Sequence, residues 1–360
     1  MLLALNCGSS SVKFQLYDAE GAATDVGGWL AAGAVEELPD GLTPTVVAHR
    51  VVHGGAGLRA ATVIDDAVLA TIATLTPLAP THQPAALAGI AMARQRWPSA
   101  VQVAVFDTAF HADLPPAAAT YALDAALAAR HGIRRYGFHG ISCRYVTERA
   151  AALLGRPVAD LNTIVLHLGS GASATAVAGG RSVDTSMGLT PLEGLVMATR
   201  AGDLDPGALL WLRQAGLSDA QLDAAVRTEG GLLGMCGDAD MRAALARRDA
   251  GDPAAALALD VYCHRLRKYV GAYHAVLGRL DAIVFTAGVG ENSAAVRSQA
   301  LSGLTPMGIA VDPARNGAGA AERVISPPGA RIAVCVIATD EQQAIADEAR
   351  ELLRGSGQAR

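Results

Sequence analysis

Residues 2–18 read LLALNCGSSSVKFQLYD: an apolar run, a turn of glycine and hydroxyl residues, and a second run with strand-like alternation. The same order returns at residues 163–177, TIVLHLGSGASATAV, with His167 in the place of Asn6. Turns of this composition let backbone N–H groups and serine hydroxyls approach phosphate oxygens. The repeat therefore predicts a duplicated fold that handles phosphate.

Apolar runs of strand length alternate with stretches of helical periodicity along the rest of the chain. Buried strands rich in Val and Ile are expected at residues 46–52, 101–106, 163–168, 282–286 and 332–338. Helices are expected at residues 66–75, 84–96, 142–154, 219–226, 254–277 and 341–353. The pattern predicts an α/β fold whose sheets begin with antiparallel hairpins.

The domain boundary is inferred from the repeat, because no Pro- or Ser-rich linker separates two halves. We expect an N-terminal domain at residues 1–110, which the C-terminal helix at 343–360 rejoins, and a second domain at 111–342. The polar tail from Gly355 to Arg360 is expected to be disordered.

Composition narrows the class of protein. The chain has 360 residues and a net charge of −5 without a Lys/Arg run, which disfavours nucleic acid and anionic membranes as partners. It shows neither a signal peptide nor an apolar run of membrane-spanning length. Its five scattered cysteines suit reduced thiols better than disulfides or zinc. We therefore expect a soluble cytoplasmic protein.

Several charged side chains follow apolar strands, where ligands bind in α/β sheets. Arg50 ends such a strand, so its guanidinium needs a partner, and a carboxylate or phosphate substrate would bind it bidentately. Arg200 is a second candidate, although pairing with Asp203 or Asp205 would explain it equally well. Asp107 closes a strand too apolar to accept a charge without compensation, which favours catalysis or metal-water contact over capping.

Two further motifs carry weaker signals. His139 lies between small residues that would let its ring meet a ligand, although a structural histidine is the plainer alternative. The Gly-x-Gly at 288–290 follows a strand and precedes a helix expected from Ser293, an arrangement that binds phosphate or simply makes a tight connection.

Seven motifs occur together in a fixed order, and through them the chain resembles the acetate kinase family from residue 6 to residue 341. They lie at residues 6–13, 49–55, 106–111, 135–140, 167–173, 199–206 and 288–292. The resemblance implies two duplicated ribonuclease H-like domains of the acetate and sugar kinase/heat-shock/actin superfamily, with a cleft between them, the second binding the nucleotide. It implies a homodimer that reversibly transfers the ATP γ-phosphoryl group to acetate, with ATP/ADP as co-substrate and Mg²⁺, or alternatively Mn²⁺.

The resemblance also implies roles for single residues. Asp107, His139 and Arg200 match the catalytic groups, and Arg50, Val52, Phe138 and Pro191 match the acetate site. Asn6 and Glu341 match the magnesium-associated positions. The nucleotide-binding positions correspond to Lys13, His167, Leu168, Gly169, Ser170, Gly171, Asp240, Met241, Arg242, Gly288, Val289, Gly290, Glu291 and Asn292.

The chain departs from the family pattern at Cys7, Thr81 and Ser170, where Ala, Leu and Asn are common, and it is shorter between Asp18 and Val46. Ser170 is a shorter donor than Asn, and Thr81 would make the acyl pocket more polar. A propionate or butyrate kinase therefore stays open as an alternative. A noncatalytic nucleotide-binding hinge protein is less favoured, because Arg50, Asp107 and His139 would have no task.

Overall fold

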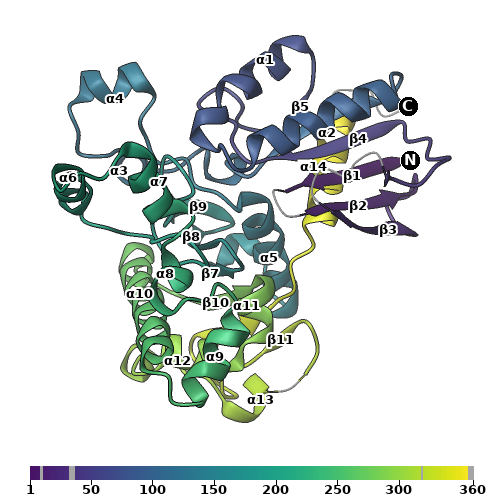
Figure 1. Cartoon of the computed structure of the whole chain (residues 1–360). Coiled ribbons are helices and arrows are strands. Elements are labelled where there is room, and N and C mark those ends of the chain that lie inside the picture. The colour runs from purple at the N-terminus through teal and green to yellow at the C-terminus, as the bar shows by residue number, and fades with distance from the viewer. Residues whose placement is uncertain (9–10, 32–36, 318, 356–360) are drawn as a thin grey trace. The chain divides into compact units, whose positions relative to one another are not determined.

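The computed structural model describes residues 1–8, 11–31, 37–317 and 319–355 (Figure 1). The serine turn expected at Ser9 and Ser10 and the tail at 356–360 lie outside these residues. The chain divides into two compact units. Unit 1 comprises Met1–Ala112, Phe138–Tyr145 and Asp340–Arg360, and unit 2 comprises Asp113–Gly137 and Val146–Thr339.

Unit 1 is built on a six-stranded mixed sheet of order β3-β2-β1-β4-β6-β5. Strands β1 (Leu2–Cys7), β2 (Ser11–Tyr17) and β3 (Ala23–Ala31) form an antiparallel meander. Next to β1 run β4 (Val46–Val51) and β6 (Val101–Phe106), both parallel to it, and β5 (Thr62–Val63) closes the far edge antiparallel to β6. The carboxyl ends of β1, β4 and β6 therefore meet at one edge.

Unit 2 repeats this sheet strand by strand, in the order β9-β8-β7-β10-β12-β11. Its antiparallel meander is β7 (Asn162–Leu168), β8 (Ala172–Ala178) and β9 (Arg181–Thr185). Strands β10 (Ala282–Thr286) and β12 (Ala333–Val336) continue parallel to β7, with β11 (Arg323–Val324) antiparallel at the edge. The duplication predicted from the two hairpins is confirmed.

Helices cover both sheets. Unit 1 has α1 (Asp66–Thr74), α2 (Gln83–Arg96) and α14 (Glu341–Gly355), with short 3-10 turns at Thr76–Leu78 and Ala109–His111; α5 (Gly140–Leu153) begins in unit 1 and ends in unit 2. The helices of unit 2 are α3 (Pro116–Ala119), α4 (Ala125–His131), α6 (Pro206–Gln214), α7 (Asp219–Arg227), α8 (Gly231–Cys236), α9 (Met241–Asp249), α10 (Pro253–Leu277), α11 (Ala287–Asn292), α12 (Ala294–Leu301) and α13 (Pro313–Gly317), with 3-10 turns at Val158–Asp160 and Thr305–Met307. In the described part of the chain, no helix has the length and apolar character needed to span a bilayer.

The alternation of side chains along β1 explains why its sheet is covered on both faces. Leu2 and Ala4 pack with Ile345 of α14 on one face, whereas Leu3 and Leu5 pack with Trp97, at the end of α2, on the other. A central parallel strand is buried on both sides, so it must be apolar at every position. This accounts for the uninterrupted run at the start of the chain.

The expected strands and helices are all present, with ends shifted by a few residues. One connection differs from expectation. The Gly-x-Gly at 288–290 lies inside α11, which starts directly after β10, and the expected helix follows separately as α12. Ala287 makes this abrupt start by adopting a positive φ of 64°.

Candidate active site

Three neighbouring strand ends in unit 1 bring their polar side chains into one network. Arg50 of β4 donates from Nε and Nη2 to the two carboxylate oxygens of Asp107, which follows β6, at 3.0 and 2.6 Å. Its Nη1 donates to Oδ1 of Asn6 in β1 at 3.2 Å. The Asn6 amide in turn donates to Glu341, the first residue of α14, at 2.7 Å. The fold thus joins four predicted site residues from four elements.

The ion pair of this network is shielded from water, with side-chain exposures of 15% for Arg50 and 2% for Asp107. Burial raises the pKa of the Asp107 carboxyl, while the Arg50 charge and a backbone hydrogen bond from His139 oppose that shift. For Arg50, burial favours the neutral form, but the charges of Asp107 and Glu341 outweigh it and the pKa ends above its ordinary value. The partner that Arg50 needs is therefore Asp107.

His139 is held in a backbone conformation that side chains rarely adopt. Its φ is 57°, and in the described residues only Ala287 shares a positive φ among non-glycine residues. Such a residue costs on the order of 1–3 kcal/mol and persists only where its surroundings enforce it. Here Gly140, which starts α5, donates its N–H to the Asp107 carbonyl at 2.8 Å. His139 is thereby fixed beside Asp107.

The acyl-site candidates of unit 1 are apolar and buried, as a methyl-binding surface requires. Val52 is 7% exposed and Phe138 1%. The ring of His53 meets that of Phe138 edge-on at 5.4 Å, and Nε2 of His111 bonds to the Phe138 carbonyl at 3.0 Å. Thr81 is exposed, with its hydroxyl bonded to His82, so its effect on acyl preference stays a prediction.

In unit 2 the second hairpin turn lies against α11. Gly169 bonds across the turn to the Gly171 carbonyl at 2.9 Å. A side chain at Gly169 would come within 3.7 Å of Ala287, whereas one at Gly288 would meet nothing within 4 Å. Ser170 in the turn and Gly288 in α11 are both exposed, which leaves room for a phosphate group there.

The nucleotide candidates Lys13, Asp240 and Arg242 contact nearby side chains. Asp240 caps α9 and binds the Arg242 guanidinium at 2.6 Å; this hydrogen bond, with help from the Arg242 backbone, lowers the pKa of Asp240 to about 2. Met241 between them is buried in the core. In unit 1, the Lys13 ammonium lies over the Trp29 ring at 3.9 Å. None of these contacts tests their assignment to the nucleotide.

Arg200 differs from Arg50 in having no carboxylate partner in the described residues. Its Nη1 donates to the carbonyl of Pro191 at 3.0 Å and contacts the sulfur of Met197 at 3.6 Å. Burial, followed by the charge of Arg227, lowers the pKa of Arg200 to about 10. A guanidinium shielded from water and left without a counter-ion is prepared to bind an anion.

The alternative that Arg200 pairs with a neighbouring aspartate is not what the structure shows. Asp203 accepts from Gly194 N at 2.8 Å and from the Tyr269 hydroxyl at 2.9 Å. Asp205 caps α6 through Gly207 N at 2.8 Å. Asp203 also forms an ion pair with Arg265 at 3.5 Å, so both carboxylates have partners other than Arg200.

Sequence reasoning missed one buried support. Arg297 of α12 is 1% exposed and donates to the carbonyls of Gly290 and Glu291, at 2.8 Å each. It thereby holds the end of α11. Its Nε donates to Oδ1 of Asn316 at 2.7 Å. An arginine inside an ordinary helical pattern gives no signal for this role, because the α11 atoms that it holds are backbone carbonyls.

The unit 1 network also fits a magnesium ion by its chemistry. The described residues contain no group of three or more His, Cys, Asp or Glu side chains that could hold a metal. Magnesium, however, commonly takes one or two carboxylates and fills its other positions with phosphates and water. Asn6, Asp107 and Glu341 offer hard oxygen donors, and two formal negative charges face the single positive charge of Arg50. This excess favours a cation.

Comparison with known proteins identifies the family to which this chain belongs. A profile described as the Acetokinase family matches residues 30–347. The acetate kinase of Streptomyces avermitilis is 49% identical over 98% of this chain and 97% of its own length, and that of Streptomyces coelicolor is 50% identical over 99% and 98%. Among solved structures, Porphyromonas gingivalis acetate kinase superposes with a TM-score of 0.89 at 37% identity, covering 98% of this chain and 99% of that one. A propionate kinase from Francisella tularensis gives 0.89 at 38%, covering 96% and 98%. The chain belongs to the acetokinase family.

Proposed function

We propose that this chain is a phosphotransferase that moves the γ-phosphoryl group of ATP to acetate, reversibly, giving acetyl phosphate and ADP. Identity of about half to acetate kinases over nearly the whole chain supports this reaction. The observation that carries it within the structure is the pair of shielded arginines, one bound to a carboxylate and one without. Two anions have to meet in this reaction, and such cations reduce their repulsion.

Acetate needs no general base, because a carboxyl group with a reference pKa of about 4 is ionised at neutral pH. Asp107 therefore serves as an organising group and not as a proton acceptor. A guanidinium has five N–H donors, and Arg50 uses three of them on Asp107 and Asn6. It can thus hold the acetate carboxylate without leaving Asp107, while Val52, Phe138 and Pro191 receive the methyl group.

The transferring phosphoryl group spreads its charge over three equatorial oxygens in a loose transition state. We assign Arg200 and His139 to these oxygens, since preorganised donors at the developing charge are usually the largest catalytic contribution. The nucleotide is assigned to Lys13, His167–Gly171, Asp240–Arg242 and Gly288–Asn292. The exposure of Ser170 in the turn and of Gly288 supports the phosphate part of this assignment.

Asn6, Glu341 and Asp107 would hold the magnesium ion, or manganese in its place. When bound, this ion would neutralise charge on the β and γ phosphates. Arg50 and the His139 backbone N–H fix the Asp107 carboxylate from the other side. We further propose that residues 1–110 and 343–360 form one domain and residues 111–342 the nucleotide-binding domain, in a cytoplasmic homodimer.

A second candidate is propionate as the acceptor, because the chain is 38% identical to a propionate kinase. Turnover of the purified protein on acetate, propionate and butyrate, with ATP and Mg²⁺, separates the two. Hydroxylamine in the same assay traps the acyl phosphate as a hydroxamate. A protein that hydrolyses ATP slowly and yields no hydroxamate would be the hinge protein considered from the sequence.

The site assignment is tested by Arg50→Ala and Arg200→Ala. Each should lower turnover by about 100- to 1000-fold, the typical loss for one such contact. Arg144→Ala and Arg149→Ala are matched controls, because each removes an arginine that is paired with a glutamate and has no part in the proposed site, in units 1 and 2 respectively. Near-normal turnover in both test variants would refute the assignment.

A further inference from the structure

The carbonyl that receives Arg200 belongs to a segment that side chains hold at several points. Pro191 lies between Leu189 and Glu193, and its oxygen accepts from Arg200 Nη1 at 3.0 Å. The other contact of this guanidinium, to the Met197 sulfur, is weak. The position of the Pro191 carbonyl therefore decides where the Arg200 guanidinium points.

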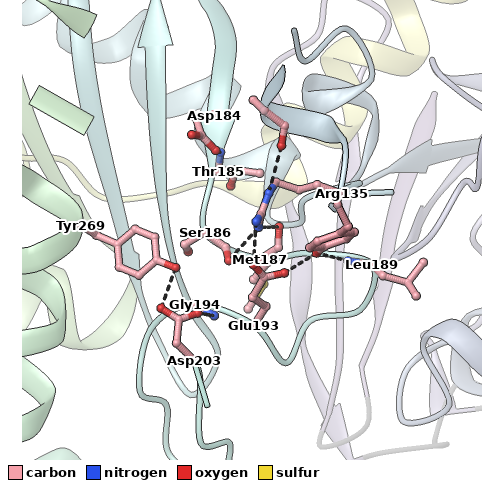
Figure 2. A network of polar contacts seen from close by, with 12 residues as sticks. Arg135, Asp184, Thr185, Ser186, Met187, Leu189, Glu193, Gly194, Asp203 and Tyr269 are labelled. Carbon is pink, nitrogen blue, oxygen red and sulfur yellow. Dashed lines mark hydrogen bonds and ion pairs between the residues drawn. The ribbon is translucent and has the colours of Figure 1, made fainter. Parts of the chain in front are cut away.

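Arg135 fastens this segment at both ends, as Figure 2 shows. Its Nη1 donates to the carbonyls of Ser186 and Met187 at 3.2 and 3.1 Å. Its Nη2 donates to Oε1 of Glu193 at 2.6 Å. One guanidinium thus spans the stretch that contains Pro191.

Tyr121 also contacts this segment, and we call Arg135, Tyr121 and Glu193 together the clasp. Its hydroxyl donates to Oε2 of Glu193 and accepts from Leu189 N at 3.2 Å. The Arg135 guanidinium stacks over the Tyr121 ring at 5.4 Å. A side chain at Gly188 would collide with both Glu193 and the Tyr121 hydroxyl, so the segment packs closely on this pair. Glu193 therefore uses both carboxylate oxygens within the clasp.

We propose that Glu193 is a positioning residue for phosphoryl transfer, which sets the Pro191 carbonyl and through it the orientation of Arg200. This inference rests on the proposed function. Its physical logic is that a carboxylate placed directly on Arg200 would neutralise the charge that the transferring group needs. Here the Glu193 carboxylate binds Arg135 and Tyr121, and Arg200 contacts only the neutral carbonyl of Pro191.

Glu193→Gln keeps the size of the side chain but leaves it with one oxygen acceptor. The Arg135 guanidinium and the Tyr121 hydroxyl, which each donate to one carboxylate oxygen in the wild type, then cannot both be satisfied. We expect turnover to fall roughly tenfold with the KM for ATP within about twofold, because small misplacements of a catalytic group can cost up to about 100-fold. Glu322→Gln is the matched control: both oxygens of Glu322 are also engaged, in its case by the single arginine Arg149 at 2.8 and 2.7 Å, and its side chain is similarly exposed. It should keep wild-type turnover.

The decisive measurement is a double-mutant cycle with Arg200→Ala, followed with radiolabelled ATP so that slow rates are measurable. If Glu193 acts through Arg200, adding Glu193→Gln to Arg200→Ala should cause no further loss. A second tenfold loss in that background, or unchanged turnover in Glu193→Gln alone, would overturn the inference. If Glu193→Gln does not fold, Tyr121→Phe replaces it in the same cycle. A wild-type protein that makes no acetyl phosphate would instead refute the proposed function itself.

Discussion

Two buried histidines in unit 1 make its stability depend on pH. His49 is 1% exposed and bonds through Nε2 to Gln102 at 2.8 Å; His111 is fully buried and bonds to the Phe138 carbonyl at 3.0 Å. Burial lowers the pKa of each to about 4 in the folded protein. The unfolded value is near 6.5. Both rings are therefore neutral in the fold at neutral pH.

The sign of the effect follows from the lowered pKa. The unfolded chain takes up protons below about pH 6.5, and the folded chain does so only near pH 4, so stability is complete above pH 6.5 and declines between these values. Because the pKa of each histidine is lowered from 6.5 to about 4, each should reduce the free energy of unfolding by about 2 kcal/mol between pH 7 and pH 5. Together the two should cost unit 1 about 4 kcal/mol over that interval.

Urea unfolding at pH 7 and pH 5, followed by the tryptophan fluorescence to which buried Trp97 of unit 1 contributes, measures this loss. Carboxylates also titrate in this range, so the double variant His49→Gln/His111→Gln serves as the reference. Glutamine keeps a polar group at the Nε2 position and does not titrate. The wild-type protein should lose about 4 kcal/mol more than the double variant, and each single variant about 2 kcal/mol less than the wild type. Equal losses in wild type and double variant would refute the argument.

Two substitutions probe packing. Gly140→Ala would drive a Cβ into the Asp107 carbonyl, so we expect a loss of about 1–3 kcal/mol together with reduced turnover; unchanged melting temperature and activity would contradict this. Tyr262→Phe removes a buried hydroxyl that has no hydrogen-bond partner in the described part of the chain, and should raise the unfolding free energy by about 1 kcal/mol. Urea unfolding measures it, and a less stable variant would show that the hydroxyl is satisfied.

The sequence predicted the architecture well because the relevant signals are local. A strand buried on both faces must be apolar throughout, and a hairpin turn must be polar, so β1–β2 and β7–β8 are visible as patterns. The start of α11 was missed because it depends on Ala287 adopting a positive φ, which no residue preference predicts for alanine.

The candidate site was predicted as a set of residues but not as a set of contacts. That Arg50 needs an anionic partner follows from its strand, yet the partner is Asp107, which follows another strand whose register no local pattern encodes. Similarly, Arg200 stands beside two aspartates in sequence and binds neither. Glu193 gave no signal at all, because it acts on backbone geometry through Arg135 and Tyr121.

The two arginines of the proposed reaction are prepared for different tasks. Arg50 is neutralised by Asp107, and with Glu341 its surroundings carry a formal excess of negative charge. In the proposed reaction such a group would orient acetate through its remaining N–H donors, and the excess negative charge would favour a divalent cation beside it. Arg200 has no counter-ion in its shielded position, which destabilises the protein when no anion is bound. A bound anion would remove this destabilisation by pairing with the guanidinium. An interaction that is strongest for the most highly charged state of the reaction raises turnover more than it raises affinity. Under the proposed function, the carboxylate on Arg50 and the neutral carbonyl on Arg200 therefore leave the two guanidiniums with different net charge toward the reacting anions.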